Sequence, residues 1–307
     1  MIAIPKEDYI HKEERRGDDM SKINKPYNKK HIKCELYNDS MQNWKKYPIH
    51  KAQMIIADVP YNVGNNFYGS NPMWYVGGDN KNGESALAGK AAFTSDYNFN
   101  LYEYFHFCSQ LMKKEPKRGG ERGKSSDAPC MIVFCAFEQI QTLIQAAQKH
   151  GFTHNIPLVF IKNYSPQVLK ANMRVVGATE YAMLFYRSYL PKFRNNGNMI
   201  FNWFTWEKDS KEIPKIHPAQ KPVKLLKRLI TIFTDPEDVV IDPCFGSGAT
   251  ARACIETGRN FYGFEINKDF YTKARDEMCN THWYDDTHQI AGQINIETWT
   301  SLYQVTG

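Results

Sequence analysis

Short runs of consecutive apolar residues alternate with amphipathic stretches along most of the chain. Such runs are typical of strands buried on both faces of a parallel sheet, and they occupy residues 32–37, 52–57, 130–134, 156–162, 180–187, 239–241 and 260–264. Apolar positions with helical spacing predict helices over residues 100–112, 140–149, 222–233 and 249–256. Strands that alternate with helices predict an α/β fold with a doubly wound, mostly parallel sheet of Rossmann type.

Several segments show neither pattern. Residues 1–30 are charged and irregular, which predicts a loosely held N-terminal tail. Residues 62–100 are rich in glycine, asparagine and aromatic side chains and are too long for an ordinary connection, so we expect a functional loop there. Residues 113–127 are basic and rich in glycine, and residues 188–216 are mainly polar and aromatic.

Composition restricts the classes of protein that fit this chain but does not indicate a function. The chain has 307 residues, of which 42% are hydrophobic, and this is enough to bury one sizeable core. A net charge of +6 favours a polyanionic partner without establishing one. The seven cysteines include no C-x-x-C pair, which indicates buried thiols in a reducing compartment rather than disulfides or a zinc site. Because the sequence shows no signal peptide and no long apolar run, we expect a cytoplasmic protein.

Residues 239–267, VVIDPCFGSGATARACIETGRNFYGFEIN, are the most informative stretch for a cofactor. A buried strand enters a glycine turn and then a helix, which offers backbone N–H groups to a ligand. Glu265 ends the next strand, where a carboxylate can accept hydrogen bonds from a ribose diol. Residues 246–251 also fit the dinucleotide pattern G-x-G-x-x-A, so this stretch alone leaves open a nicotinamide or flavin oxidoreductase, or a purely structural turn.

Three short segments, taken together, narrow this choice. Residues 242–248, DPCFGSG, resemble the S-adenosylmethionine-binding loop of amino-directed DNA methyltransferases. Residues 217–223, HPAQKPV, resemble the segment that precedes this loop in those enzymes. Residues 58–61, DVPY, end a buried strand upstream and are similar to the family's tetrapeptide Asp-Pro-Pro-Tyr, with valine in place of the first proline. The order of the segments is that of the beta-type members of the family.

The resemblance implies a catalytic domain over residues 31–280 and a C-terminal extension over residues 281–307. Within the domain it implies a target-recognition segment at 188–216 and a cofactor region at 217–267. It further implies transfer of a methyl group from S-adenosylmethionine to adenine N6 in DNA, with cytosine N4 as the alternative. An aspartate rather than a serine at the start of the tetrapeptide favours adenine. An oxidoreductase and an inactive DNA-binding relative remain open as other classes.

The chemistry of the tetrapeptide agrees with this resemblance. An exocyclic amine shares its lone pair with the ring and is therefore a poor nucleophile. Asp58 and the backbone carbonyl of Val59 can accept both amino hydrogens and favour a pyramidal nitrogen that attacks a methyl group in line. Pro60 restricts the turn, and Tyr61 is expected to stack on a base that has left the duplex. A valine can supply the carbonyl as well as a proline, although with a less rigid φ.

The expected cofactor residues come from both downstream segments and from Glu265 at the end of the following strand, with Lys221 expected near the methionine carboxylate as a point charge. The set is His217, Gln220, Lys221, Asp242, Phe245, Gly246, Ser247, Gly248 and Glu265. A turn followed by a helix start at Pro222 explains the proline of the upstream segment but not the whole string.

Fewer residues are expected to contact DNA. Asp39 ends the first strand, where related enzymes place an acid near the base or the cofactor adenine, although a local turn or helix cap explains it equally well. The basic residues Arg118, Arg122 and Lys124 are candidates for phosphate contacts or for a solvated loop. Cys244 follows a proline, as the nucleophile of a carbon-5 methyltransferase does, but it lies in the glycine loop and lacks a base. An oligomer is compatible with the sequence.

Overall fold

The computed structural model describes residues 32–61, 99–117, 126–163, 167–170, 175–217, 219–279, 289–290 and 293–295. The predicted tail 1–30, residues 62–98 of the predicted loop, and Arg118, Arg122 and Lys124 lie outside these ranges, as does most of the predicted C-terminal extension. Within the described part of the chain, no helix combines the length and the apolar character needed to span a membrane.

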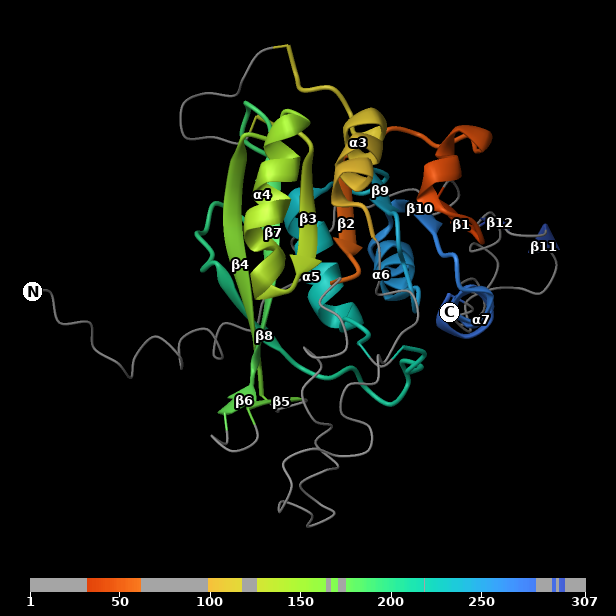
Figure 1. The fold of residues 1–307 in the computed structure, drawn as a ribbon. Helices are drawn as coiled ribbons and strands as arrows, with labels where there is room; N and C mark the ends of the chain where they lie inside the picture. Colours follow the sequence, from red (N-terminus) through yellow and green to blue (C-terminus); the bar gives the residue numbers. More distant parts are fainter. Residues whose placement is uncertain are drawn as a thin grey trace, which may run out of the picture.

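One large twisted sheet runs through the described residues, in the strand order β11-β12-β1-β10-β9-β2-β3-β7-β4-β8 (Figure 1). Its strands, in chain order, are β1 Lys33–Tyr37, β2 Met54–Asp58, β3 Cys130–Cys135, β4 His154–Lys162, β7 Thr179–Tyr186, β8 Trp203–Trp206, β9 Val239–Asp242, β10 Asn260–Phe264, β11 Gln289–Ile290 and β12 Gln293–Asn295. A separate two-stranded sheet pairs β5 Gln167–Lys170 with β6 Val175–Gly177.

The middle of the large sheet is parallel. Strands β1, β10, β9, β2 and β3 all run in the same direction, and Ile55 of β2 pairs with Ile241 of β9. From β2 the chain continues through helix α3 Leu101–Leu111 to β3 on one side, and from β9 through α6 Ala249–Thr257 to β10 on the other. The β2–β9 pair is therefore a topological switch point, where open α/β sheets bind ligands beyond the carboxyl ends of the strands. The expected fold class is confirmed.

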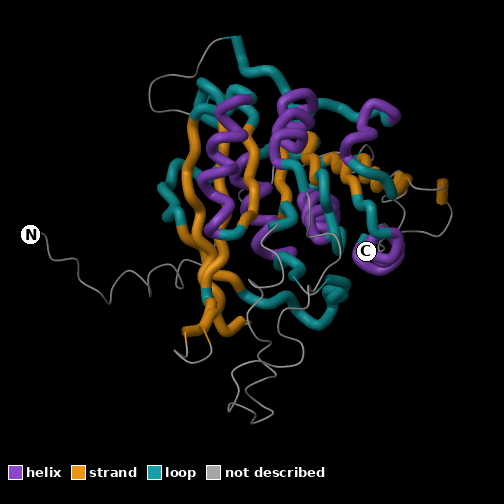
Figure 2. The backbone as a smooth tube through the Cα atoms, in the orientation of Figure 1, coloured by secondary structure: helices purple, strands orange, loops and turns teal. Residues whose placement is uncertain are grey.

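Alternation along each strand builds a core on both faces of the sheet. In β2, Met54 and Ile56 pack with α5 Val223–Phe233 and α6, whereas Ile55 and Ala57 pack with α3 and α4 Ile140–Lys149. Figure 2 shows the sheet as a layer between these two pairs of helices. Successive side chains of a strand point to opposite faces, so a run of apolar residues is the pattern that two covered faces require.

Helix boundaries follow local chemistry. Asn100 caps α3 by accepting hydrogen bonds from the N–H groups of Tyr102 and Glu103, and the helix ends one residue before its predicted limit. Gly248 (φ +77°) begins α6 and Gly258 (φ +73°) ends it. A Cβ at Gly248 would lie 2.8 Å from the Ala274 Cβ, so packing as well as backbone conformation requires glycine there.

The sequence pattern missed the shorter elements. These are β8, the hairpin β5–β6, the pair β11–β12, the short helices η3 Met41–Lys46, η4 Phe137–Gln139 and α7 Lys268–Lys273, and the π-helical turn η6 Ala274–Met278. The pattern also carried no information on strand direction. β7 lies antiparallel between β3 and β4, while β8 lies parallel to β4. The start of β7 therefore lies at the same edge as the carboxyl end of β2.

The packing of α5 gives a stability prediction. Leu229 is fully buried against the sheet, so Leu229→Ala should lower the free energy of unfolding by about 2–5 kcal/mol, because the cavity it leaves adds to the lost transfer free energy. Urea denaturation followed by circular dichroism measures the change. In the same helix, Lys224→Ala removes an exposed ion pair with Glu207 and should cost less than about 1 kcal/mol. Equal losses in the two variants would contradict this packing.

Candidate active site

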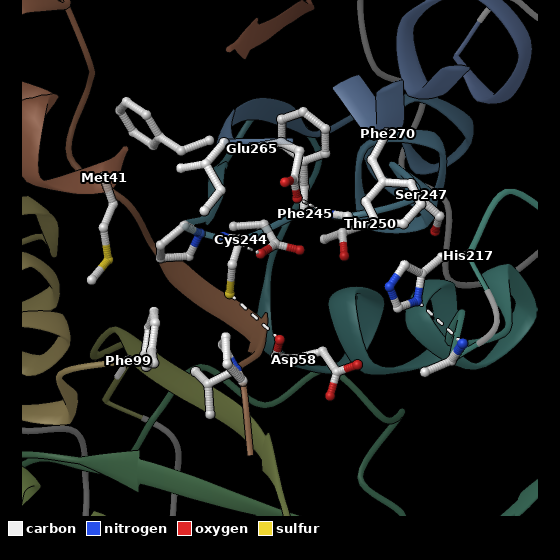
Figure 3. A pocket seen from close by; sticks show the side chains of 18 of the residues that line it. Met41, Asp58, Phe99, His217, Cys244, Phe245, Ser247, Thr250, Glu265 and Phe270 are labelled. Atoms are coloured by element: carbon white, nitrogen blue, oxygen red, sulfur yellow. Dashed lines mark hydrogen bonds between the residues drawn. The ribbon is translucent and has the colours of Figure 1, made fainter. Parts of the chain in front are cut away.

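A cavity of about 280 Å³ opens at the carboxyl edge of the sheet, at the switch point between β2 and β9. The residues around it come from segments far apart in the chain, and they include Ser40, Asp58, Tyr61, Phe99, His217, Lys221, Asp242, Gly246, Glu265 and Phe270. In Figure 3, Met41 and Phe99 lie on one side, His217, Ser247 and Phe270 on the other, and Asp58 and Cys244 between them. The cavity thus joins the predicted catalytic and cofactor segments.

Asp58 is the last residue of β2 and is 30% exposed in its side chain. Its Oδ1 accepts a hydrogen bond from the Tyr61 hydroxyl at 3.2 Å, and its Oδ2 forms a close ion pair with Lys221. Burial raises the pKa of Asp58, whereas the Lys221 ammonium acts in the opposite direction. The carboxylate therefore lies at the cavity as an oriented acceptor of hydrogen bonds.

Lys221 is buried, with 6% of its side chain exposed, and lies just before α5. Its Nζ also lies 3.3 Å from Oε2 of Glu180, on β7. Burial acts to lower the pKa of Lys221, but the two carboxylates outweigh it and raise the pKa, so the side chain is an ammonium. The structure brings Lys221 to the predicted catalytic tetrapeptide, and its expected contact with the methionine carboxylate stays a prediction.

The turn after Asp58 is held from a neighbouring element. The Gln139 side chain, at the end of η4, donates a hydrogen bond to the Pro60 carbonyl at 3.0 Å. Val59 is buried, and Tyr61 lines the cavity. Valine lacks the fixed φ of proline, but packing and the Gln139 hydrogen bond also restrain the backbone of this turn. Valine in place of proline is thus compatible with a fixed turn.

The glycine turn after β9 forms the opposite wall. Asp242 accepts a hydrogen bond from the Cys244 N–H at 3.1 Å, and Thr250 also bonds to it. Gly246 has φ +52°, and a Cβ there would meet no atom within 4 Å. Because Gly246 lines the cavity, its missing side chain leaves that space open to a ligand. Ser247 and Phe245 complete the wall.

Glu265 follows β10 and closes this half of the site. One carboxylate oxygen accepts from the Gly246 N–H at 2.9 Å and the other from the Asn267 N–H at 2.7 Å. Burial raises its pKa. Each carboxylate oxygen can accept more than one hydrogen bond, so Glu265 keeps capacity for two hydroxyl groups of a ligand. Apolar side chains of Ile266 and Phe270 lie beside it in the cavity lining. A carboxylate next to an apolar wall and an open glycine turn fits a nucleoside-containing cofactor.

Residues 217–220 connect this wall to Lys221. The His217 Nδ1 accepts a hydrogen bond from the Ala219 N–H at 3.1 Å, and burial lowers the His217 pKa to about 4, so the ring is neutral at pH 7. Its ring meets Phe270 edge-on at 4.7 Å between centroids. The Gln220 side chain bonds to the backbone of Ile216 and Pro214, which folds the loop back on itself.

Comparisons with known proteins agree with this arrangement. A model of the DNA methylase family, which covers N6- and N4-methyltransferases, matches residues 52–276. This range includes the tetrapeptide and the glycine turn, which lie on opposite walls of the cavity. The chain belongs to the DNA methylase family. The predicted family, an amino-methyltransferase acting on DNA, and S-adenosylmethionine as its methyl donor are confirmed, and the oxidoreductase alternative is wrong.

Curated relatives and solved structures extend the comparison. The methylase is 27% identical over 259 residues to DNA adenine methyltransferase YhdJ of Escherichia coli, covering 78% of this chain and 80% of the relative. It is 24% identical to type II methyltransferase M2.DpnII of Streptococcus pneumoniae, over 83% of this chain and 93% of that one. The fold resembles a structure of the M1.HpyAVI–SAM complex with a TM-score of 0.57 and 23% identity, over 80% and 99% of the two chains. It also resembles the cytosine-N4-specific PvuII methyltransferase with a TM-score of 0.54 and 14% identity, over 86% and 92%.

Cys244 of the methylase has the surroundings of an unreactive thiol. Its Sγ lies 3.5 Å from the Asp58 carbonyl. Burial, together with nearby Asp242, Asp58 and Glu265, raises the Cys244 pKa well above its ordinary value. Since the thiolate is the nucleophilic form, this position does not suit carbon-5 methylation.

Asp39 does not line the cavity. Its carboxylate accepts hydrogen bonds from the Ser40 N–H, the Asn43 amide and the Tyr47 hydroxyl, at 2.6–2.8 Å. These contacts around the start of η3 agree with the local-turn interpretation. The next residues, Ser40 and Met41, do line the cavity.

Glu180 and Gln139 contact the tetrapeptide or its ion-pair partner but were not among the site residues predicted from the sequence. Glu180 is the first residue of a predicted strand, and its side chain points to the same face as Ala182 and Leu184, which are buried against α5. A charged residue on a buried face indicates an ionic partner. Gln139 carried no comparable signal, because its role depends on where η4 lies relative to the tetrapeptide.

The cofactor wall generates a binding prediction. Glu265→Gln should weaken the binding of S-adenosylmethionine about 10- to 100-fold, because hydrogen bonds to a charged acceptor contribute about 1.5–3 kcal/mol. Isothermal titration calorimetry measures the Kd. Glu277→Gln, at an exposed position outside the cavity lining, should leave the Kd unchanged. An unchanged Kd in Glu265→Gln would remove Glu265 from the cofactor site.

Asp242 generates a prediction on pH. Burial raises the pKa of Asp242 to about 7, so the folded protein holds a proton there that the unfolded chain has lost above its ordinary pKa near 3.8. The contribution of Asp242 to stability therefore falls as pH rises from about 4 to about 7. As pH rises through that range, the free energy of unfolding of Asp242→Asn should increase relative to that of the wild type by roughly 1–3 kcal/mol. Urea unfolding of both apoproteins at pH 4.5 and 7.5 measures the difference, and a pH-independent difference would contradict the shifted pKa.

Proposed function

We propose that this methylase transfers the methyl group of S-adenosylmethionine to N6 of adenine in DNA, with Asp58 as the main acceptor for the target amino group. The observation that supports this most directly is the position of Asp58. Its carboxylate faces the same cavity as the Glu265 wall, at the switch point of the sheet. An amino group held at Asp58 and a cofactor held at Glu265 would therefore meet inside one cavity.

The residues of the tetrapeptide have different roles in this proposal. Asp58 and the Val59 carbonyl accept the two amino hydrogens, which orients the nitrogen and favours its pyramidal form. Tyr61 donates its hydroxyl to Asp58, which keeps the carboxylate in one orientation. S-adenosylmethionine supplies an electrophilic sulfonium methyl group when bound. Glu265, the Gly246 turn and the neutral His217 line the other side of the cavity.

The target base must leave the DNA double helix to reach Asp58. A cavity of about 280 Å³ has room for single groups and not for a duplex, and Asp58 is one of the residues that line it. Enzymes that act on a base inside a duplex rotate the nucleotide out and hold it by hydrogen bonds and aromatic stacking. Tyr61 and Phe99, which line the cavity, are the aromatic candidates for that stacking.

Two observations favour adenine over cytosine. The relatives YhdJ and M2.DpnII match most of this chain, and YhdJ is described as a DNA adenine methyltransferase. The tetrapeptide also begins with aspartate. The likeness to the PvuII enzyme concerns the fold and does not bear on the base.

Segment 188–216 is the proposed target-recognition segment. Its strand β8 ends the large sheet, and large apolar side chains of the segment are exposed, including Met199, Phe201 and Trp203. Phe201 and Trp203 stack with centroids 5.6 Å apart. Flat exposed side chains of this kind suit contacts with bases or sugars. Residues 62–100 and the basic residues Arg118, Arg122 and Lys124 are proposed to share the DNA contacts.

Replacing the acceptor tests the mechanism. Asp58→Asn should lower the rate of methyl transfer at least about 100-fold, comparable to the loss of one preorganised electrostatic contact in other enzymes. The Kd for S-adenosylmethionine should stay within about twofold. Transfer of tritiated methyl groups to duplex DNA measures the rate, and Asp276→Asn, at an exposed site, is the control. Wild-type transfer by Asp58→Asn would remove Asp58 from the mechanism.

The modified base is tested separately. DNA from cells that express the protein should contain N6-methyladenine at a defined sequence, and DNA from cells that express Asp58→Asn should not. Mass spectrometry of the nucleosides identifies the base, and modification-sensitive sequencing identifies the site. N4-methylcytosine in place of N6-methyladenine would overturn the adenine assignment and leave the amino-transfer chemistry intact.

A further inference from the structure

Four charged side chains of alternating sign lie in a row at the carboxyl edge of the sheet. Lys162, at the end of β4, pairs closely with Oε1 of Glu180, and Lys221 lies 3.3 Å from Oε2 of the same carboxylate. Lys221 then pairs closely with Asp58. Glu180 is therefore shared between two lysines, and Lys221 between two carboxylates.

Strand alternation explains how these side chains meet. Asp58, Glu180 and Lys162 are in phase with residues of their own strands that pack on the α5 face, namely Ile56, Ala182 and Phe160. Because β7 is antiparallel to both β3 and β4, its first residues and the last residues of β4 lie at the edge where β2 ends. Lys221 enters this row from the segment before α5.

Aromatic rings enclose the row. The Trp206 ring centroid lies 4.8 Å from the Lys162 Nζ and 5.6 Å from the Lys221 Nζ, and the Phe134 centroid lies 5.3 Å from the Lys221 Nζ. Glu180 Oε2 is buried, and the Lys221 ammonium at 3.3 Å is its ionic partner within the described residues. A buried carboxylate oxygen with spare accepting capacity, next to a lysine that also contacts Asp58, attracts that lysine away from Asp58.

We infer that Glu180 and Lys162 are positioning residues for methyl transfer. Together they make the Lys221 ammonium interact with both Glu180 and Asp58 rather than with one of them. Asp58 therefore stays ionised and still accepts the target amino group. This inference rests on the proposed function of Asp58. Without Glu180, Lys221 binds Asp58 alone and competes with the target. Without Lys162, Glu180 draws Lys221 away, and Asp58 loses its counter-ion.

The effect on protonation follows from the signs of the charges. Lys221 and Lys162 together keep the pKa of Glu180 low against the effect of burial. Lys221 acts to lower the pKa of Asp58 and Glu180 acts to raise it. The titratable and charged groups facing Asp58 and its ion-pair partner are Lys221, Glu180, Tyr61, Cys135, Cys244, Asp242 and His217. Glu180 and Lys162 are the two members of the row that can be changed without touching the cavity lining.

Two substitutions should therefore have opposite effects. In single-turnover methyl transfer at saturating DNA and cofactor, activity falls at acid pH as Asp58 is protonated. Glu180→Gln should move this acid limb to lower pH by about one unit and lower the plateau rate about tenfold, since Lys221 then binds Asp58 alone. Lys162→Met should move the acid limb to higher pH, since Glu180 then withdraws Lys221. The Kd for S-adenosylmethionine should change less than about threefold in both.

Two further variants separate positioning from folding. Glu180→Asp keeps the charge and should restore the wild-type acid limb, with a plateau rate between those of the wild type and Glu180→Gln. Asp238 is a matched control, because it also lies between two lysines, 2.9 Å from Lys113 and 2.6 Å from Lys192, but outside the cavity lining. Asp238→Asn should lower thermal stability and leave the acid limb unchanged.

The outcomes distinguish this inference from the function on which it rests. Active Asp58→Asn would overturn the proposed function itself. Inactive Asp58→Asn, with acid limbs in Glu180→Gln and Lys162→Met that stay at the wild-type position or move in the same direction, would overturn the division of Lys221 and leave the function standing. Opposite shifts, rescue by Glu180→Asp and an unmoved acid limb in Asp238→Asn support the inference.

Discussion

The proposed catalytic edge of this protein depends on the burial of one ammonium group. Lys221 has lost most of its contact with water, and a buried charge costs several kcal/mol unless opposite charges and hydrogen bonds compensate it. Asp58 and Glu180 provide that compensation from two different strands. The same ion pairs therefore join the segment before α5 to β2 and β7. Removing Lys221 would take a counter-ion from both carboxylates, and removing either carboxylate would leave Lys221 with a single counter-ion.

The sheet places the two halves of the reaction beside each other. Ile55 pairs with Ile241, so the ends of β2 and β9 lie side by side although their residues are far apart in the chain. Helices leave these strands toward opposite sides, which opens a crevice that the glycine turn and the tetrapeptide line. The turn itself is restricted by packing: Gly248 has no room for a Cβ beside Ala274, and Gly263 has none beside Phe261 and Phe245. Close packing beneath the turn is thus combined with open space at Gly246.

Burial acts to raise the pKa of every acid near the cavity, and the contacts of each acid decide the net shift. Asp242 and Glu265 have raised pKa values because they are buried without a lysine or arginine in contact among the described residues. Glu180 has a lowered pKa because two lysines contact it. Acids on the cofactor wall thus rely on backbone N–H donors, while the acids on the catalytic wall rely on lysines. A cationic cofactor is better accommodated beside acids that have no fixed counter-ion.

The sequence alone determined the α/β fold, the family and the two segments that form opposite walls of the cavity, because apolar runs, the glycine turn and the tetrapeptide are local patterns. Such patterns specify which face of a strand is buried and where a strand ends. They do not specify strand direction or neighbours, since these depend on how distant segments pack. Only the tertiary structure therefore placed β7 antiparallel beside β3 and brought Glu180 and Lys162 to Asp58. For the same reason only the tertiary structure paired Lys221 with Asp58 and placed the Asp39 carboxylate in contacts with Asn43 and Tyr47.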